Sequence, residues 1–211
     1  MKKILSSAAA LLLMASTHSF AGIITTTGNG SAATDVDRIA TFDGISGSLL
    51  GYTEDGLSIS VNDSNCCFTG VHYGSGGNND FVTISTVDGL DFFGLELDFG
   101  TGFRDGLHNV VWETKRDGLT TGSGILNDIF ASNGLRNGFS VLGWSDENLF
   151  DTLLIGAAPV NDGYNAFGQF QAIALDNVKV DFSAPISVPE PASIALLGLG
   201  LAGIGFSRKR K

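Results

Sequence analysis

The most constraining feature of the sequence is a two-residue alternation of apolar and polar side chains, interrupted by turn dipeptides. Residues 57–61, 93–99 and 178–182 alternate in this way, which gives a strand one apolar face and one polar, outward face. Asp-Gly or Asn-Gly, which favour tight hairpins, occurs at 43–44, 55–56, 88–89, 105–106, 117–118, 133–134, 137–138 and 162–163. The pattern predicts an all-β fold, an antiparallel β-sandwich or jelly roll, over residues 22–186.

One segment of this region departs from the alternation. Further strands are predicted at 39–45, 81–87, 108–114, 139–143, 150–156 and 167–175. Between them, Ile125, Leu126, Ile129 and Phe130 have the spacing of one face of a helix, and Asn133-Gly134 would end it. We therefore expect a short helical insertion over residues 123–132.

The N-terminus has the three parts of a secretory signal peptide. Lys2 and Lys3 precede an apolar run at 4–15, and Ser19 and Ala21 occupy the positions of a small-x-small cleavage site. Residues 1–21 are predicted to be removed on export, and an uncleaved anchor is the alternative. Export would place the chain where disulfides form.

The C-terminus is predicted to be a transmembrane segment. Residues 192–206 carry no charge, and Arg208, Lys209, Arg210 and Lys211 follow as a membrane stop signal. Fifteen helical residues span roughly 22 Å, against about 30 Å of hydrocarbon, so the anchor would be marginal. The basic end would stay in the cytoplasm, and residues 22–186 would lie outside it.

This end of the chain resembles a known protein-sorting signal. The motif Val188, Pro189, Glu190, Pro191, the Gly-rich apolar stretch and the basic end are similar to PEP-CTERM signals of exported proteins in Gram-negative bacteria, over residues 187–211. The resemblance implies that exosortase, a membrane cysteine protease, recognises the Pro-Glu-Pro element. It also implies a transient anchor in the inner membrane, followed by delivery to the cell surface or extracellular matrix.

The charge of the central region limits its partners. Residues 22–187 hold 21 of the 22 acids and 6 of the 12 Lys and Arg residues, a formal charge of −15. Such a domain repels phosphate backbones, so we expect no nucleic-acid partner. Hard cations suit its many Asp and Asn side chains better.

No motif predicts an active site. His72 and His108 lack the spacing of metal ligands or of a catalytic triad, and are expected to be ordinary strand or loop residues. Glu96 and Asp98 share a face of one predicted strand, as the two carboxyls of a glycosidase would, but so do acids on any solvent-facing strand. We therefore expect a protein that is not an enzyme.

The adjacent Cys66 and Cys67 are predicted to form a vicinal disulfide, with intermolecular bridges or free thiols as the alternatives.

Trp144, which precedes a polar run at 145–148, is a candidate platform for stacking on sugars. Trp112 lies in an apolar run and is expected to pack in the core.

The last part of the domain, 170–182, loosely resembles the final strand of carbohydrate-binding jelly rolls. The resemblance implies a structural calcium held by Asp176, with Asp43 as a second ligand, and the alternative is an ordinary strand irregularity at Asp176-Asn177. No other cofactor is expected. The resulting prediction is a non-catalytic surface or matrix protein with extracellular polysaccharide as a candidate partner. The alternatives are a secreted carbohydrate-active enzyme and an adhesin or assembly subunit.

Overall fold

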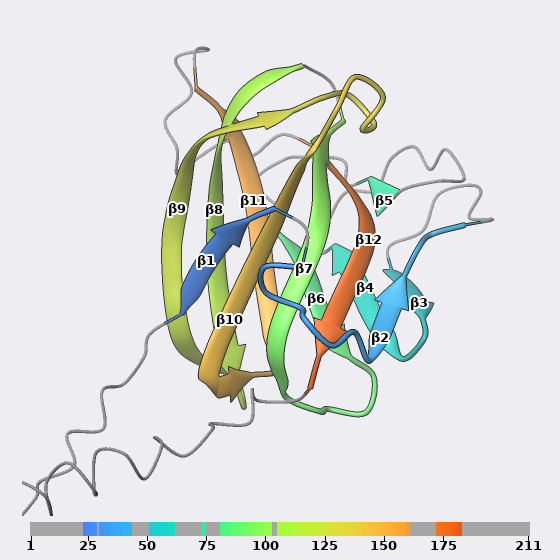
Figure 1. The fold of residues 1–211 in the computed structure, drawn as a ribbon, viewed down its shortest axis with the longest axis vertical. Coiled ribbons are helices and arrows are strands. Elements are labelled where there is room, and N and C mark those ends of the chain that lie inside the picture. Colours follow the sequence, from blue (N-terminus) through green and yellow to red (C-terminus); the bar gives the residue numbers. More distant parts are fainter. Residues whose placement is uncertain are drawn as a thin grey trace, which may run out of the picture.

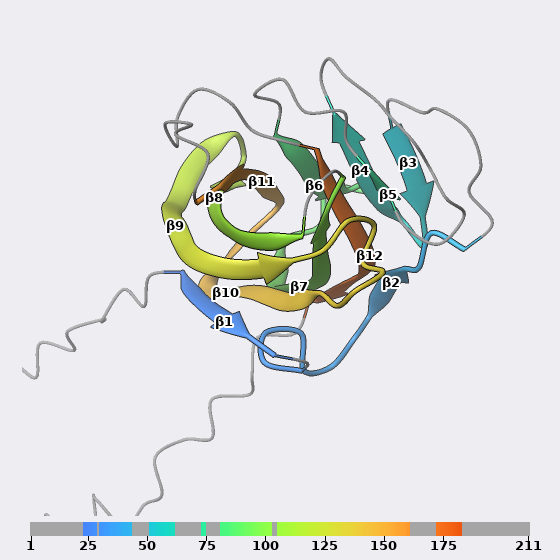
Figure 2. The same ribbon diagram turned by 90° about the horizontal axis from the view of Figure 1, so that it is seen from above.

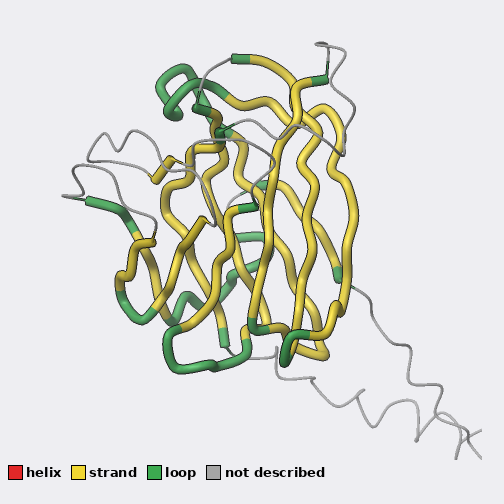
Figure 3. The backbone as a smooth tube through the Cα atoms, turned by 180° about the vertical axis from the view of Figure 1, so that it is seen from behind, coloured by secondary structure: helices red, strands yellow, loops and turns green. Residues whose placement is uncertain are grey.

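The structure, a computed structural model, describes residues 23–28, 30–43, 51–61, 73–74, 81–102, 105–160 and 172–182. Within these ranges the regular secondary structure consists of strands, and the named strands pair antiparallel (Figure 3). The predicted all-β antiparallel fold is confirmed. None of the described residues belongs to a helix that could cross a membrane, and the predicted segment 192–206 lies outside them.

Two six-stranded sheets stack as the layers of a sandwich in the described part of the chain (Figures 1 and 2). The first sheet has the order β1 (Ile24–Thr27), β10 (Ser140–Phe150), β7 (Phe92–Thr101), β12 (Ile173–Asp181), β2 (Arg38–Ala40), and β5 (Tyr73–Gly74) also pairs with β12. The second has the order β3 (Gly51–Glu54), β4 (Leu57–Val61), β6 (Val82–Thr86), β11 (Thr152–Pro159), β8 (Gly106–Arg116), β9 (Leu119–Ala131).

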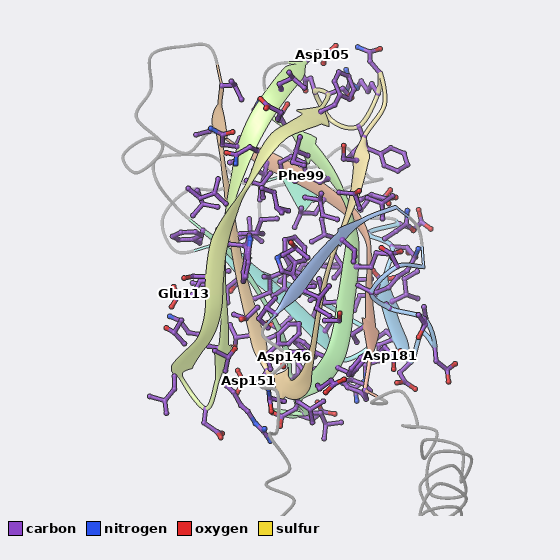
Figure 4. All side chains as sticks on the ribbon, turned by 60° about the vertical axis from the view of Figure 1, so that its left-hand side comes forward. Phe99, Asp105, Glu113, Asp146, Asp151 and Asp181 are labelled. Carbon is purple, nitrogen blue, oxygen red and sulfur yellow. The ribbon has the colours of Figure 1, made fainter. Side chains whose placement is uncertain are left out.

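The core lies between the two sheets and is built from the alternating apolar positions. Leu57, Ile59 and Val61 are buried on β4 while the intervening serines are half-exposed. Phe99 on β7 points into the same interior (Figure 4), and the rings of Phe92 and Phe150 meet edge to face at 5.0 Å. Trp112 is buried there, as expected.

Two of the predicted turn dipeptides close tight hairpins. Asp55-Gly56 joins β3 to β4, and Asp117-Gly118 joins β8 to β9; all four residues have positive φ. Positive φ at both central residues is the geometry whose twist matches paired strands, and the Asp-Gly sequence tolerates it. The hairpins therefore form where the sequence places them.

The predicted helical insertion over 123–132 is wrong, because residues 123–131 belong to β9, which ends at Ala131. The strand pairs with β8 along its length, with register shifts between His108 and Val110 and between Thr114 and Lys115. Asp128 has a positive φ of 57°. An extra residue in a strand resets its alternation. Leu126 and Ile129 consequently both pack against the core, although three positions apart, and the spacing imitates a helix.

The outer face of the first sheet is not the solvent-facing surface that the alternation on β7 predicted. Residues 30–37, here called the strap, cross it, and the Ser31 N–H donates to Glu96 Oε2 at 3.0 Å. Asp181 accepts from the Asp35 N–H and the Thr34 hydroxyl. Glu96 is completely buried as a result. The first sheet, whose outer face was expected to be exposed to solvent, is therefore covered here by the core on one side and by the strap on the other.

Candidate functional site

Two carboxyls meet on the part of β7 and β12 beyond the strap. Asp98 on β7 and Asp176 on β12 are direct register partners; Asp98 is buried and Asp176 is half-buried. Like charges directly opposite one another destabilise a sheet, so this pair calls for compensation. Lys179 acts on Asp98 through its charge, and its ammonium forms an ion pair at 3.3 Å with Glu96.

A bulge beside Asp176 supplies part of that compensation. The register shifts between Asp176 and Lys179, and Asn177 is the residue with a left-handed backbone, φ 46°. Its side-chain Nδ2 donates to Asp98 Oδ2 at 2.8 Å, and its backbone N–H donates to Asp176 Oδ1 at 2.8 Å. Asn is well suited to this position because its short polar side chain tolerates the left-handed region.

The electrostatics of the pair favour protonation or a bound cation. The pKa of Asp176 is raised to about 6, chiefly by burial. The Asn177 N–H acts against this increase, and the neighbouring carboxyls of Asp98, Asp43 and Glu54 contribute to it. Burial likewise raises the pKa of Asp98, although the amide of Asn177 and the charge of Lys179 oppose it. The site therefore carries an excess of negative charge.

Glu54 on β3, in the second sheet, holds the segment that precedes Asp43 by hydrogen bonds. Its Oε2 accepts from the N–H groups of Thr41 and Phe42, both at 2.9 Å, and from the Tyr52 hydroxyl at 3.1 Å. These bonds hold Phe42 at a positive φ of 56° and bring Asp43, which is exposed, toward Asp176. The structure thus brings the two predicted calcium ligands within electrostatic reach of each other.

The described side chains do not by themselves assemble a metal site. No group of three or more His, Cys, Asp or Glu side chains that could hold a metal ion occurs among residues that the structure describes. Calcium takes six to eight oxygen ligands, and Asp43 and Asp176 would provide only part of that shell. The oxygen chemistry fits calcium but the ligand count does not, so calcium stays a prediction.

Trp144 is not a sugar platform in this fold. The polar run after it suggested a loop, but β10 continues to Phe150 and turns the indole inward, with none of the residue exposed. Thr25 and Leu95 are its register partners, and no described residue accepts a hydrogen bond from its buried Nε1. A ring in this position cannot stack on a ligand.

His108 is a strand residue, on β8, where it is buried with Nδ1 placed 3.0 Å from the carbonyl oxygen of Gly106. Cys66, Cys67, His72, the sorting motif 188–191 and the basic end 208–211 lie outside the described residues.

Sequence reasoning missed three features of the carboxyl site: the pairing of Asp98 with Asp176, the amide of Asn177, and the role of Glu54. The alternation indicated that Asp98 lies on the polar face, but a strand's register depends on partners far along the chain. Asp98 and Asp176 are 78 positions apart, and no local signal links them.

Comparison with known proteins confirms the identity of the C-terminal segment. Residues 187–211 match the family model of the PEP-CTERM protein-sorting motif. The motif marks an exported protein that exosortase processes for the cell surface. No curated protein is significantly similar to the chain.

Two solved structures are similar to the central domain. The CBM22-1 xylan-binding domain of Xyn10C from Paenibacillus barcinonensis has 12% identity and a TM-score of 0.39, over 73% of this chain and 99% of that one. The family 11 carbohydrate-binding module of the cellulosomal cellulase Lic26A-Cel5E from Clostridium thermocellum has 13% identity and a TM-score of 0.32, over 71% and 98%. These scores are too low to transfer a ligand or a binding face.

Proposed function

We propose that this chain is a non-catalytic protein of the cell surface or extracellular matrix, whose β-sandwich binds or supports exopolysaccharide. The observation that carries the proposal is the order of its parts. The sandwich ends with β12 at Asp181, and the sorting motif begins only six residues later, at 187. Almost nothing separates the fold from the signal, so the sandwich is the cargo that exosortase delivers.

The proposed sequence of events uses both ends of the chain. Residues 1–21 direct export, residues 192–206 hold the chain transiently in the inner membrane, and 208–211 remain in the cytoplasm. Six residues separate Phe182 from Pro189, and the seven Cα-to-Cα steps between the two span at most about 25 Å of extended chain. Exosortase would therefore work close to the folded domain, at the end where β12 leaves it.

The burial of Glu96 weakens the alternative of a secreted carbohydrate-active enzyme. A glycosidase needs two carboxyls flanking a bond of the substrate. Glu96 shares a face with Asp98, as predicted, but it is sealed beneath the strap and occupied by Ser31 and Lys179. These two carboxyls cannot both reach a sugar chain.

The sorting half of the proposal is tested by fractionating the native host. We expect the protein to move from the surface or medium to the membrane when exosortase is deleted, and also in the double variant Pro189→Ala/Pro191→Ala. Pro185→Ala, just outside the motif, is the matched control and should behave as wild type. Unchanged fractionation of the double variant would contradict the proposal.

The binding half is tested by incubating the purified protein with polysaccharides and following both retention and the release of reducing ends. We expect retention of the protein without release of sugar. Steady release of reducing ends that stops after one Asp or Glu is replaced would establish the enzyme instead.

A further inference from the structure

Three exposed apolar side chains lie at the end of the sandwich opposite Asp181. Leu107 on β8 and Phe130 on β9 are direct register partners, with 46% and 42% of their surface exposed. Phe139, just before β10, is 47% exposed. Gly138 lies against the Phe130 ring, where an added Cβ would be 3.4 Å from Cε1, and the Ser140 hydroxyl donates to the Phe130 carbonyl. We call Leu107, Phe130 and Phe139 the distal patch.

The loop between β9 and β10 holds the distal patch in a fixed geometry. Asp105 accepts from the Asn133 N–H at 2.8 Å and from Asn137 Nδ2 at 2.7 Å, and these bonds lower the pKa of its carboxyl. Within the loop, the Ser132 hydroxyl accepts from the Asn137 N–H and donates to the Gly138 carbonyl. Because the loop is already ordered, a ligand would not have to order it on binding.

Polar groups stand beside these rings. Asn133, Arg136 and Asn137 are all exposed on the same loop. Asn137 directs its Nδ2 to Asp105, which leaves its Oδ1 without a described donor, and the Arg136 guanidinium offers several donors. The rings offer apolar faces for stacking and the polar groups offer hydrogen bonds, which are the two kinds of contact that a sugar ring can make.

The position of the distal patch suits a ligand outside the cell. Asp105 lies at the opposite end of the sandwich from Asp181, where β12 ends and the chain continues toward the sorting motif (Figure 4). On the proposed function, a domain tethered by its C-terminus points the distal patch away from the membrane. After release, the same end remains clear of the processed tail.

We infer that the distal patch binds a neutral polysaccharide, whose sugar rings stack on Phe130 and Phe139 while their hydroxyls bond to Asn137 and Arg136. This inference rests on the proposed function and names its binding surface. The formal charge of −15 on residues 22–187 opposes an anionic polysaccharide. Three half-exposed side chains offer on the order of 300 Å², well short of the roughly 800 Å² per partner of a stable interface with a second copy.

The test is native affinity electrophoresis through gels containing β-glucan, xylan, galactomannan or the anionic alginate. The full-length gene is expressed in the native host, and its product is purified in the form in which the host leaves it. We expect at least one neutral polysaccharide to retard the wild-type protein. Phe130→Ala/Phe139→Ala should weaken that binding by about tenfold, since each ring contributes its own stacking contact.

The matched control is Leu119→Ala/Val87→Ala, which removes two side chains that are 74% and 60% exposed near the hairpin turns at the other end. It should bind within twofold of wild type.

If the patch variant binds as wild type does, or if only alginate retards the protein, the inference fails while polysaccharide binding stands. If the variant instead abolishes a concentration-dependent dimer, the occupant is a second copy. Should no polysaccharide retard the wild-type protein, the binding half of the proposed function fails, and this inference with it.

Discussion

Asp98 and Asp176 lie directly opposite each other across β7 and β12, and Asn177 is the residue that links them. The pKa of Asp176 is raised to about 6 from an ordinary value of 3.8, chiefly by burial. Between these two pH values the folded chain binds more protons than the unfolded chain does. The contribution of Asp176 to stability is therefore complete below about pH 4 and is lost as the pH rises through about 6.

We expect the Asp176→Asn variant to lose this pH dependence. Two pKa units correspond to at most about 3 kcal/mol, which solvent screening of a half-buried carboxyl reduces to roughly 1–2 kcal/mol. Urea unfolding of the exported protein in EDTA, at pH values from about 4.5 to 7.5, measures the difference between variant and wild type. Asp117→Asn, at an exposed turn, is the control and should follow wild type. Parallel curves for all three proteins would refute the assignment.

Calcium should reverse the effect of Asp176 at neutral pH. If Asp43 and Asp176 are calcium ligands, the ion stabilises the folded state by mass action and favours the ionised carboxyls. We expect millimolar CaCl₂ to raise the melting temperature of the wild-type protein by several degrees, and that of Asp43→Asn or Asp176→Asn by much less. An equal increase in all of these proteins would exclude both residues as ligands.

The bulge at Asn177 makes a separate prediction, because it combines a left-handed backbone with a hydrogen bond to Asp98. Asn177→Gly keeps the backbone geometry and loses the bond, which costs about 1 kcal/mol. Asn177→Ala loses both, and should cost about 1 kcal/mol more than the glycine variant. Chemical denaturation resolves the two steps. Asn127→Ala, on the exposed part of β9, should stay within about 0.5 kcal/mol of wild type.

These predictions depend on features that the sequence shows only in part. Alternation and Asp-Gly turns predicted the strand class and the hairpins at 55–56 and 117–118, because both follow from local geometry. Alternation failed at β9, where the bulge near Asp128 resets its phase. The prediction for Trp144 failed for another reason: the polar run at 145–148 resembles a loop when the partner strands are unknown.

Glu96 shows the same limit on the polar face of β7. Its strand position was predicted correctly, but a segment some 60 residues earlier covers it. Burial of a polar face by a distant segment leaves no periodic signal. Two glycines are the sequence feature that reflects this burial, because Gly94 and Gly143 both lie directly beneath Ala32 of the strap and leave room for it.

The fit of the strap against the sheet gives the last prediction. In Gly94→Ala, the new Cβ would overlap the backbone carbonyl group of Ala32, which, unlike a side chain, cannot move aside by changing its rotamer. We expect a loss of about 1–3 kcal/mol and faster cleavage by Asp-N endoproteinase before Asp35, because the strap must lift from the sheet. Gly51→Ala is the control, since its nearest contact would be 3.7 Å, and it should be close to neutral. The distal patch lies on other elements, so Gly94→Ala should still bind polysaccharide. A variant with unchanged proteolysis would mean that the strap does not rest on Gly94.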